Sequence, residues 1–322
     1  MYLLDIAFLL PGDIVLTAQD AKVSKAIRRL TGGTFSHAML YVDYGSLIHS
    51  DQQGVHSQNT QRVLLAAPDA AMVLRLARRS DQATIRKICD YARAAVGTQY
   101  SIPEAIASRV KRHSNSSART NRQFCSRLVA EAYSHAGHSL VPNPSYCYPS
   151  DLHNIDLLAP VENCVREASK LEIAFAKSPS PLEVQTRVTN AHLEKLRAIA
   201  SEDIQNEEQT VACLLRRPEL DAQFTASLVA SGYLDLWKME VNANPWRYMD
   251  SSFAELDLST ADRQHEVKLA KESAERFSRM LNIYQQLGGR FQLQYFAANE
   301  SLYKKLLGLQ LKLVSLMEST DP

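Results

Sequence analysis

The sequence predicts an α+β fold: a small antiparallel sheet with packed helices, followed by a mostly α-helical C-terminal domain. Seven of the eleven glycines lie before residue 165, where they separate short runs typical of β-strands. Beyond residue 180 the apolar residues recur with the period of an α-helix. We therefore expect two domains, at residues 1–165 and 180–322, which suits a chain of 322 residues.

Strands and helices alternate irregularly in the first half. Turn residues bound three short apolar runs, which predicts strands at Asp13–Thr17, Ala38–Val42 and Met72–Leu76. A tight turn at Tyr44-Gly45 joins the second of these strands to the run Gly45–Ser50, which predicts a β-hairpin. Apolar residues at spacings of three and four predict helices at Val23–Leu30, Asp81–Val96 and Phe124–Ala136.

The second half is expected to consist of helices. Residues 166–178 have a helical pattern, and Ser178-Pro179-Ser180-Pro181 then indicates a linker. The further predicted helices are Leu182–Ala200, Ile204–Leu215, one that begins at Pro218, Ala261–Leu287 ended by Gly288-Gly289, and Asn299–Met317.

The last predicted helix carries a leucine seam. Its members step by four, three, four and three residues: Leu302, Leu306, Leu309, Leu313 and Leu316. A buried helix of a bundle explains this pattern most simply. A helix that binds a protein partner or a membrane surface is the alternative.

Composition excludes several classes of protein. Lys plus Arg is 36 and Asp plus Glu is 35, so a net charge of +1 gives no reason to expect a nucleic-acid partner. No apolar run reaches the roughly 18 residues of a membrane span. Residues 1–10 are apolar but carry Asp5 and lack a basic start, which argues against a signal peptide. We expect synthesis in the cytoplasm, with export by a specialised secretion system left open.

Five widely spaced cysteines, without a C-x-x-C pair, argue against a disulfide framework or a zinc ribbon. The chain also lacks H-E-x-x-H, Walker-type and G-x-G-x-x-G motifs. The sequence therefore predicts a protein that uses neither a cofactor nor a metal.

Cys125 stands where a polar loop becomes an amphipathic helix. Backbone N–H groups at a helix N-terminus favour a thiolate and can also hold an oxyanion. A cysteine that merely fills the core is the alternative. The other four cysteines lack this setting.

Two histidines flank the predicted hairpin turn at similar distances. His37 opens one strand and His49 lies on the next, so the two side chains could be neighbours across the strands. His49 would then hold His37 in one orientation, as the third member of a catalytic triad does. His56, seven residues further on, is the alternative for that third position.

Four motifs make the first half resemble a known family. They are Pro11-Gly12-Asp13-Ile14-Val15-Leu16, Phe35-Ser36-His37-Ala38-Met39-Leu40-Tyr41-Val42, Gly97-Thr98-Gln99-Tyr100-Ser101 and Phe124-Cys125-Ser126-Arg127-Leu128-Val129. Over residues of about 8–165 the chain is similar to the circularly permuted NlpC-type papain-like superfamily. That group includes bacterial permuted hydrolases and lecithin:retinol acyltransferase-like enzymes. The resemblance does not extend to residues 180–322.

The resemblance implies roles for individual residues. Cys125 matches the nucleophile, His37 the general base and His49 the third polar residue of a Cys-His-His triad. Tyr100 matches a tyrosine near the active site that assists the oxyanion. A histidine at the third position is typical of the acyltransferase-like branch, whereas Ser126-Arg127 after the nucleophile is closer to the bacterial hydrolases.

Three functions follow as hypotheses. The favoured one is a cysteine hydrolase or acyltransferase that works through a thioester and cleaves acyl esters of membrane phospholipids, with a role as a bacterial toxin or effector. The alternative is a peptidase or amidase that acts on cell-wall or isopeptide amide bonds. The third is a papain-like scaffold without catalysis, whose helical half binds a protein partner.

Overall fold

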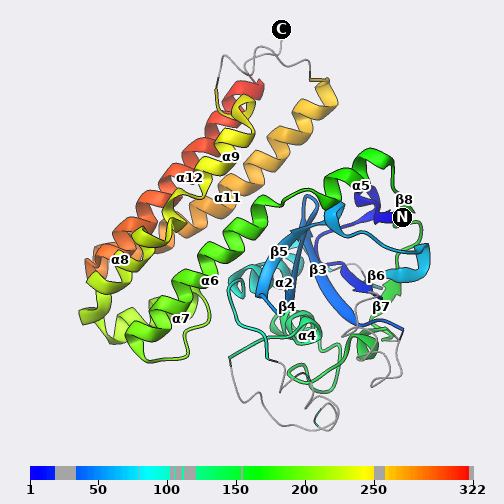
Figure 1. Cartoon of the computed structure of the whole chain (residues 1–322), viewed down its shortest axis with the longest axis horizontal. Coiled ribbons are helices and arrows are strands. Elements are labelled where there is room, and N and C mark those ends of the chain that lie inside the picture. The colour runs from blue at the N-terminus through cyan, green and yellow to red at the C-terminus, as the bar shows by residue number, and fades with distance from the viewer. Residues whose placement is uncertain are drawn as a thin grey trace. The chain divides into compact units, whose positions relative to one another are not determined.

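A six-stranded antiparallel sheet organises the first half of the chain (Figure 1). The computed structural model describes residues 1–18, 34–78, 80–101, 105, 111, 121–153, 155–249 and 258–318. The strands follow the order β5-β4-β3-β2-β6-β7. Their bounds are β2 (Ile14–Thr17), β3 (His37–Asp43), β4 (Ser46–Asp51), β5 (Gly54–Asn59), β6 (Ala71–Leu76) and β7 (Leu158–Pro160). A second, two-stranded sheet pairs β1 (Tyr2–Leu4) with β8 (Val165–Glu167).

Two helices pack on one face of the larger sheet. These are α2 (Gln82–Ala94) and α4 (Cys125–His135), whose apolar faces share a core with alternate residues of β2 and β3. The other face of the same strands packs on residues near the N-terminus and around Cys164. Because both faces are covered, β2 is buried along its whole length. The α+β class predicted from the sequence is confirmed.

The predicted hairpin is present and turns where expected. Tyr44 and Gly45 both have positive φ, 46° and 73°, as a two-residue β-turn with the twist of the strands requires. The turn joins β3 to β4, and β5 then pairs antiparallel with β4. This places three consecutive strands at one edge of the sheet.

The chain divides into two compact units. The first comprises Met1–Thr186 with Gln205–Glu208, and the second comprises Arg187–Ile204 with Gln209–Pro322. The border between them falls inside a helix, α6 (Pro181–Ala200), rather than in the proline-rich segment before it. Helix α5 (Lys170–Lys177) belongs to the first unit.

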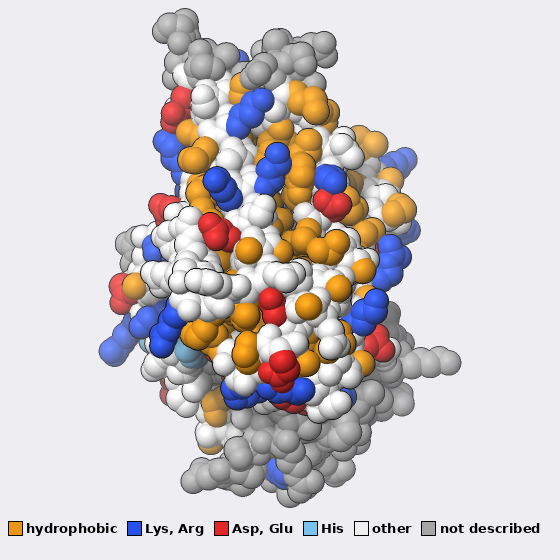
Figure 2. All heavy atoms as spheres, turned by 90° about the vertical axis from the view of Figure 1, so that its left-hand side faces the viewer, with side chains coloured by type: hydrophobic (Ala, Val, Ile, Leu, Met, Phe, Trp, Pro, Cys, Tyr) orange, Lys and Arg blue, Asp and Glu red, His pale blue; other side chains and the backbone are white. Residues whose placement is uncertain are grey.

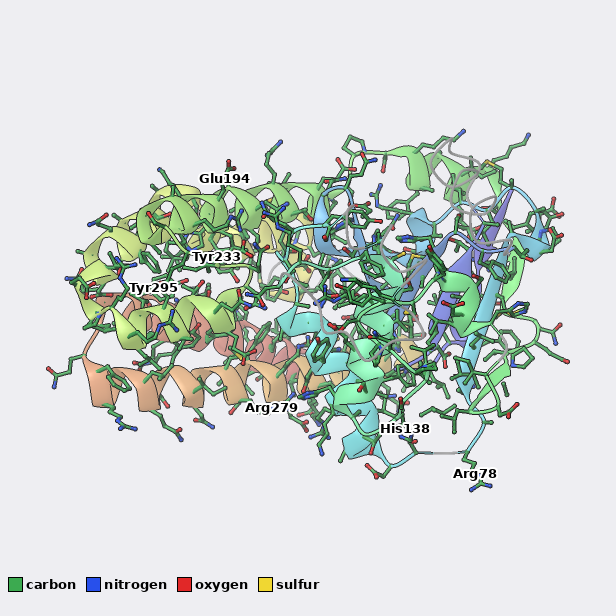
Figure 3. All side chains as sticks on the ribbon, turned by 90° about the horizontal axis from the view of Figure 1, so that it is seen from below. Arg78, His138, Glu194, Tyr233, Arg279 and Tyr295 are labelled. Carbon is green, nitrogen blue, oxygen red and sulfur yellow. The ribbon has the colours of Figure 1, made fainter. Side chains whose placement is uncertain are left out.

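Helices alone make up the described part of the second unit. After α6 they are α7 (Glu207–Arg216), α8 (Asp221–Ser231), α9 (Trp237–Ala243), α11 (Thr260–Phe291) and α12 (Gln294–Glu318). Aromatic residues form much of their core, and Figure 3 shows Tyr233 and Tyr295 inside the bundle while Glu194 of α6 points outward. Leu302 and Leu313 of the leucine seam are buried, and Leu306, Leu309 and Leu316 are partly exposed.

The carboxylate of Asp221 fixes the start of α12. Its two oxygens accept the backbone N–H groups of Gln294 and Tyr295, at 2.8 and 2.9 Å. A negative charge at this position satisfies N–H groups that the helix itself leaves without acceptors. This cap explains why α12 begins five residues before the predicted start at Asn299.

Two further predicted elements were wrong at their ends. Gly288-Gly289 does not end its helix, because α11 continues to Phe291 and terminates at Gln292, whose φ of 52° is left-handed. Packing of α11 along α12 offsets the weak helix propensity of the two glycines. Residues 166–167 are not helical, because β8 pairs with β1 and the helix starts only after the capping box of Ser169 and Glu172. The helix predicted at Val23–Leu30 lies outside the described residues.

Within the described part of the chain, no helix combines the length and the apolar content that crossing a membrane requires. On the face shown in Figure 2, basic and acidic side chains are interspersed with hydrophobic ones.

Gly54, at the start of β5, is a glycine whose replacement should strongly destabilise the first unit. Its φ is +90°, and a Cβ there would lie 2.5 Å from the carbonyl oxygen of Thr98. We expect Gly54→Ala to lower the free energy of unfolding by about 2–4 kcal/mol, since backbone strain and a backbone clash add. Gly137→Ala is the matched control, because its φ is +91° but nothing lies within 4 Å of its Cβ. Equal losses in denaturant titrations of the two variants would contradict this reading.

His192 should make the helical unit sensitive to acid. Its ring nitrogens lie 3.1 Å from the Ser227 hydroxyl and 3.4 Å from the Tyr295 hydroxyl, and burial lowers its pKa to about 4. The folded state therefore binds fewer protons than the unfolded state once the pH falls below the ordinary histidine pKa of 6.5. This contribution to stability is complete above pH 6.5 and is lost as the pH falls toward 4.

We expect wild type to lose about 2 kcal/mol more stability than His192→Gln between pH 8 and pH 5. Chemical unfolding followed by circular dichroism measures the difference. His135→Gln, at an exposed histidine, should keep the wild-type dependence. A His192→Gln profile parallel to wild type would disprove the assignment.

Candidate active site

The thiol of Cys125 lies at the first residue of α4, as the sequence predicts. The residue before it, Phe124, is extended and provides no side-chain cap, and the helical hydrogen bonds begin with the N–H of Leu128. The backbone N–H groups of Ala38, Ser126 and Cys125 itself face the sulfur and lower its pKa. Burial is the larger effect and raises the pKa of the thiol overall. The resting thiol is therefore protonated, in a setting that is ready to stabilise a negative charge.

A polar network holds the start of α4 in place. The hydroxyl of Ser126 donates to the carbonyl of Cys147 at 2.7 Å. Glu131 accepts hydrogen bonds from Gln123 at 2.8 Å and from Arg127 at 2.9 Å, and so ties the segment before Cys125 to the helix. Glu131 is engaged in these structural bonds and does not act as a partner of the thiol.

Tyr100 is brought to this end of the helix by backbone pairing. The N–H of Gln123 donates to the carbonyl of Gln99, and the N–H of Ser101 donates to the carbonyl of Gln123, both at 2.9 Å. Tyr100 thus pairs with a residue two positions before Cys125. Burial, followed by the charges of Cys125 and Asp51, raises the pKa of the Tyr100 phenol well above its usual value. The phenol therefore stays protonated and is available as a hydrogen-bond donor.

His37 and His49 form a hydrogen-bonded pair. His49 lies opposite Met39 in the β3–β4 register, so His37 is its diagonal neighbour on the same face. Nε2 of His37 and Nδ1 of His49 are 2.9 Å apart, and the two rings meet at 87°. His37 is also the chain neighbour of Ala38, whose N–H faces the Cys125 sulfur. The structure thus brings the thiol to the end of β3 that carries the histidine pair.

Both imidazoles are neutral at physiological pH. Burial lowers the pKa of His37 to about 4, against an opposing effect from Asp51, and His56 lowers it further. Burial and the two neighbouring histidines hold the pKa of His49 well below its usual value. A neutral imidazole is the resting form of a general base that has not yet accepted a proton.

His56 lies beside His49 but does not take part in the hydrogen bond between His37 and His49. It is directly opposite His49 in the β4–β5 register, with ring centroids 4.3 Å apart. Its Nδ1–H donates to the carbonyl of Gly54 at 3.1 Å, and Asp51 lies 3.7 Å from the same nitrogen. The hydrogen bond to His37 is thus made by His49 and not by His56.

Two groups at this site were not found from the sequence. The N–H of Ala38 could not be found, because its approach to Cys125 depends on the packing of α4 against β3. Asp51 could have been found, because it follows His49 by two residues on the same strand. Residues two apart on a strand point to the same face. It comes close to His56 because the turn from β4 to β5 is short.

Comparison with known proteins identifies the family. The family described as "Permuted papain-like amidase enzyme, YaeF/YiiX, C92 family" matches residues 9–179, just over half of the chain. The chain belongs to this family. It is also similar to a solved structure described as the metalloprotein yiiX from Escherichia coli O157:H7, with 16% identity and a TM-score of 0.32. That similarity covers 47% of this chain and 95% of the other. No curated protein matches.

The family bears on the hypotheses drawn from the sequence. The permuted papain-like relationship is confirmed, and the family is described as amidases. This favours the amidase alternative over the phospholipid esterase that we preferred from the sequence. Nothing in the comparisons supports a lipid substrate or a toxin.

Proposed function

We propose that the protein is a cysteine amidase that cleaves peptide or isopeptide amide bonds through a thioester on Cys125. One observation carries this proposal: a thiol at a helix N-terminus, faced by three backbone N–H groups, lies next to the strand end that bears a hydrogen-bonded histidine pair. These are the parts that nucleophilic catalysis by cysteine requires. The amidase description of the family supports the choice of an amide over an ester.

The chemistry proceeds in two steps. His37 takes the proton of the Cys125 thiol while the sulfur attacks the amide carbon, so an S–C bond forms. The tetrahedral intermediate collapses as the C–N bond breaks, and His37 gives its proton to the leaving amine. Water then attacks the thioester with His37 as base. The C–S bond breaks, the acid product leaves and the thiol regains its proton.

The N–H groups that face the sulfur have a second use in this scheme. Those of Cys125 and Ser126 belong to the first turn of α4, where the helix dipole favours negative charge. They would hold the oxyanion of the tetrahedral intermediate, and the protonated phenol of Tyr100 would supply a further donor.

His49 serves as a positioning residue in this mechanism. For His37 to accept a proton on Nδ1, its Nε2 must carry a hydrogen and donate it to Nδ1 of His49. His49 therefore fixes both the orientation and the tautomer of the base. His56 is assigned no role in proton transfer, because its ring hydrogen bond goes to Gly54.

Cys125→Ala should abolish amide cleavage without unfolding the chain. The substrate set is a panel of peptide, isopeptide and peptidoglycan-fragment amides, with mixed phospholipid vesicles in parallel and mass spectrometry as the readout. We expect wild type to release amines and to form an acyl adduct on Cys125, and the variant to do neither. Cys164→Ala is the matched control, since Cys164 is also buried but lies in another core. Undiminished amine release by Cys125→Ala would refute the mechanism, and fatty-acid release alone would restore the lipid hypothesis.

The two candidate third residues can be separated by their variants. In buffer with a metal chelator, His49→Ala should lower kcat roughly 10²-fold or more, because His37 loses its fixed tautomer, while KM and the melting temperature change little. His49→Gln should recover part of kcat, since its amide oxygen can accept from His37. His56→Ala should have a much smaller effect on kcat. The reverse order of the two alanine variants would assign the third position to His56.

A further inference from the structure

Three side chains, one of them from the His37–His49 pair, form a ligand set for a metal ion. His49, Asp51 and His56 each offer one ligand atom, and these atoms all lie within 4.8 Å of one another. Register produces the cluster: His49 and His56 are directly opposite, and Asp51 follows His49 by two residues on the same face. Ligands bound to a tetrahedral ion at about 2.1 Å are about 3.4 Å apart, so only a small closure is needed.

The second observation is a buried nitrogen without a partner. His49 is 4% exposed, and its Nε2 has no hydrogen-bond partner among the described residues. The side chain of Gln58 is near enough to favour the charged form of His49, but it makes no hydrogen bond of normal geometry with Nε2. A buried polar nitrogen left this way is destabilising unless a ligand satisfies it.

The surroundings also suit an ion. His56 donates its Nδ1–H to the carbonyl of Gly54, which leaves Nε2 free for an ion, and metal-bound histidines commonly donate their other ring N–H in this way. The side chain of Asp51 is 39% exposed, so the cluster is reached from solvent at that end. Two imidazoles and one carboxylate are a typical ligand set for zinc, with water in the remaining position.

We propose that His49, Asp51 and His56 bind a divalent transition-metal ion of the zinc class, and that this ion inhibits catalysis by preventing His37 from accepting the proton of Cys125. The binding half depends only on the three side chains. The inhibitory half rests on the proposed function.

Inhibition follows from the tautomers. An ion on Nε2 of His49 leaves the ring proton on Nδ1, which must then donate to Nε2 of His37 across 2.9 Å. Neutral His37 then carries its own proton on Nδ1. It has no lone pair left for the thiol proton, and the nearby positive charge opposes a second proton on the ring. Removal of the ion lets His49 accept from His37 again, which restores the base.

Metal binding is tested first, with the full-length chain stripped by a chelator and then dialysed. Co²⁺ is titrated and followed by its visible absorption, and bound Zn²⁺ is counted by elemental mass spectrometry. We expect one ion per wild-type chain and at least a tenfold weaker affinity in His56→Ala and in Asp51→Asn. His135→Ala and Asp69→Asn, at exposed residues of the same types, should bind as wild type does.

The thiol must be excluded as the real ligand. Cys125→Ala should keep the Co²⁺ spectrum and the stoichiometry. Loss of binding in Cys125→Ala, or wild-type binding in both His56→Ala and Asp51→Asn, would overturn the site.

The switch is tested separately. Nitrogen NMR of ¹⁵N-histidine protein should show the proton of His37 move from Nε2 to Nδ1 when Zn²⁺ is added. Amide cleavage should fall at least tenfold with Zn²⁺ and return with chelator, and His56→Ala should need at least ten times more Zn²⁺ for the same loss. Binding without a change of tautomer would overturn the switch. Metal binding that depends on His56 and Asp51 in a chain without amidase activity would support the site and count against the proposed function.

Discussion

The antiparallel register of β3, β4 and β5 is the constraint on which the candidate site depends. It sets His37 diagonal to His49 and sets His56 opposite His49, so three imidazoles from different strands meet on one face. Side chains alternate along a strand, and a slip of one residue would turn His49 to the opposite face. The left-handed turn at Tyr44-Gly45 and the register shift between Tyr41 and Asp43 together set this pairing at one end. The pairing that brings the three histidines together is therefore set by a turn and a register shift that contain none of them.

Burial gives the site its electrostatic character. The same packing that covers both faces of the sheet removes water from the thiol and from the histidine pair, which keeps each of them neutral. Charge separation between sulfur and imidazole is then unfavourable at rest. It becomes favourable only when backbone N–H groups share the new negative charge. In the proposed mechanism, this burial keeps the thiol and the histidines neutral until a substrate carbonyl is bound.

The sequence predicts the parts of this site that are local. The helix start at Cys125 and the hairpin between His37 and His49 depend on neighbouring residues, and the structure contains both. The closeness of His56 and Asp51 to His49, and of Ala38 to the thiol, depends on strand pairing and helix packing that no short window encodes. Gly288-Gly289 shows the same limit, because tertiary packing overrides a strong local stop signal. Substrate choice depends on a whole surface, and the preference for lipid, drawn from family analogy and from one histidine, had correspondingly little basis.

The border between the two units has a consequence for how such a chain can be recombined. The family match ends at residue 179, yet the first compact unit also includes Gln205–Glu208, which follow α6 in the sequence. The buried side chain of Gln205 accepts the backbone N–H of Gln99 at 2.8 Å, directly before Tyr100. A gene fusion that replaced everything after residue 179 would leave that N–H without its acceptor. The first unit is thus discontinuous in sequence, and a boundary placed at residue 179 would remove part of it.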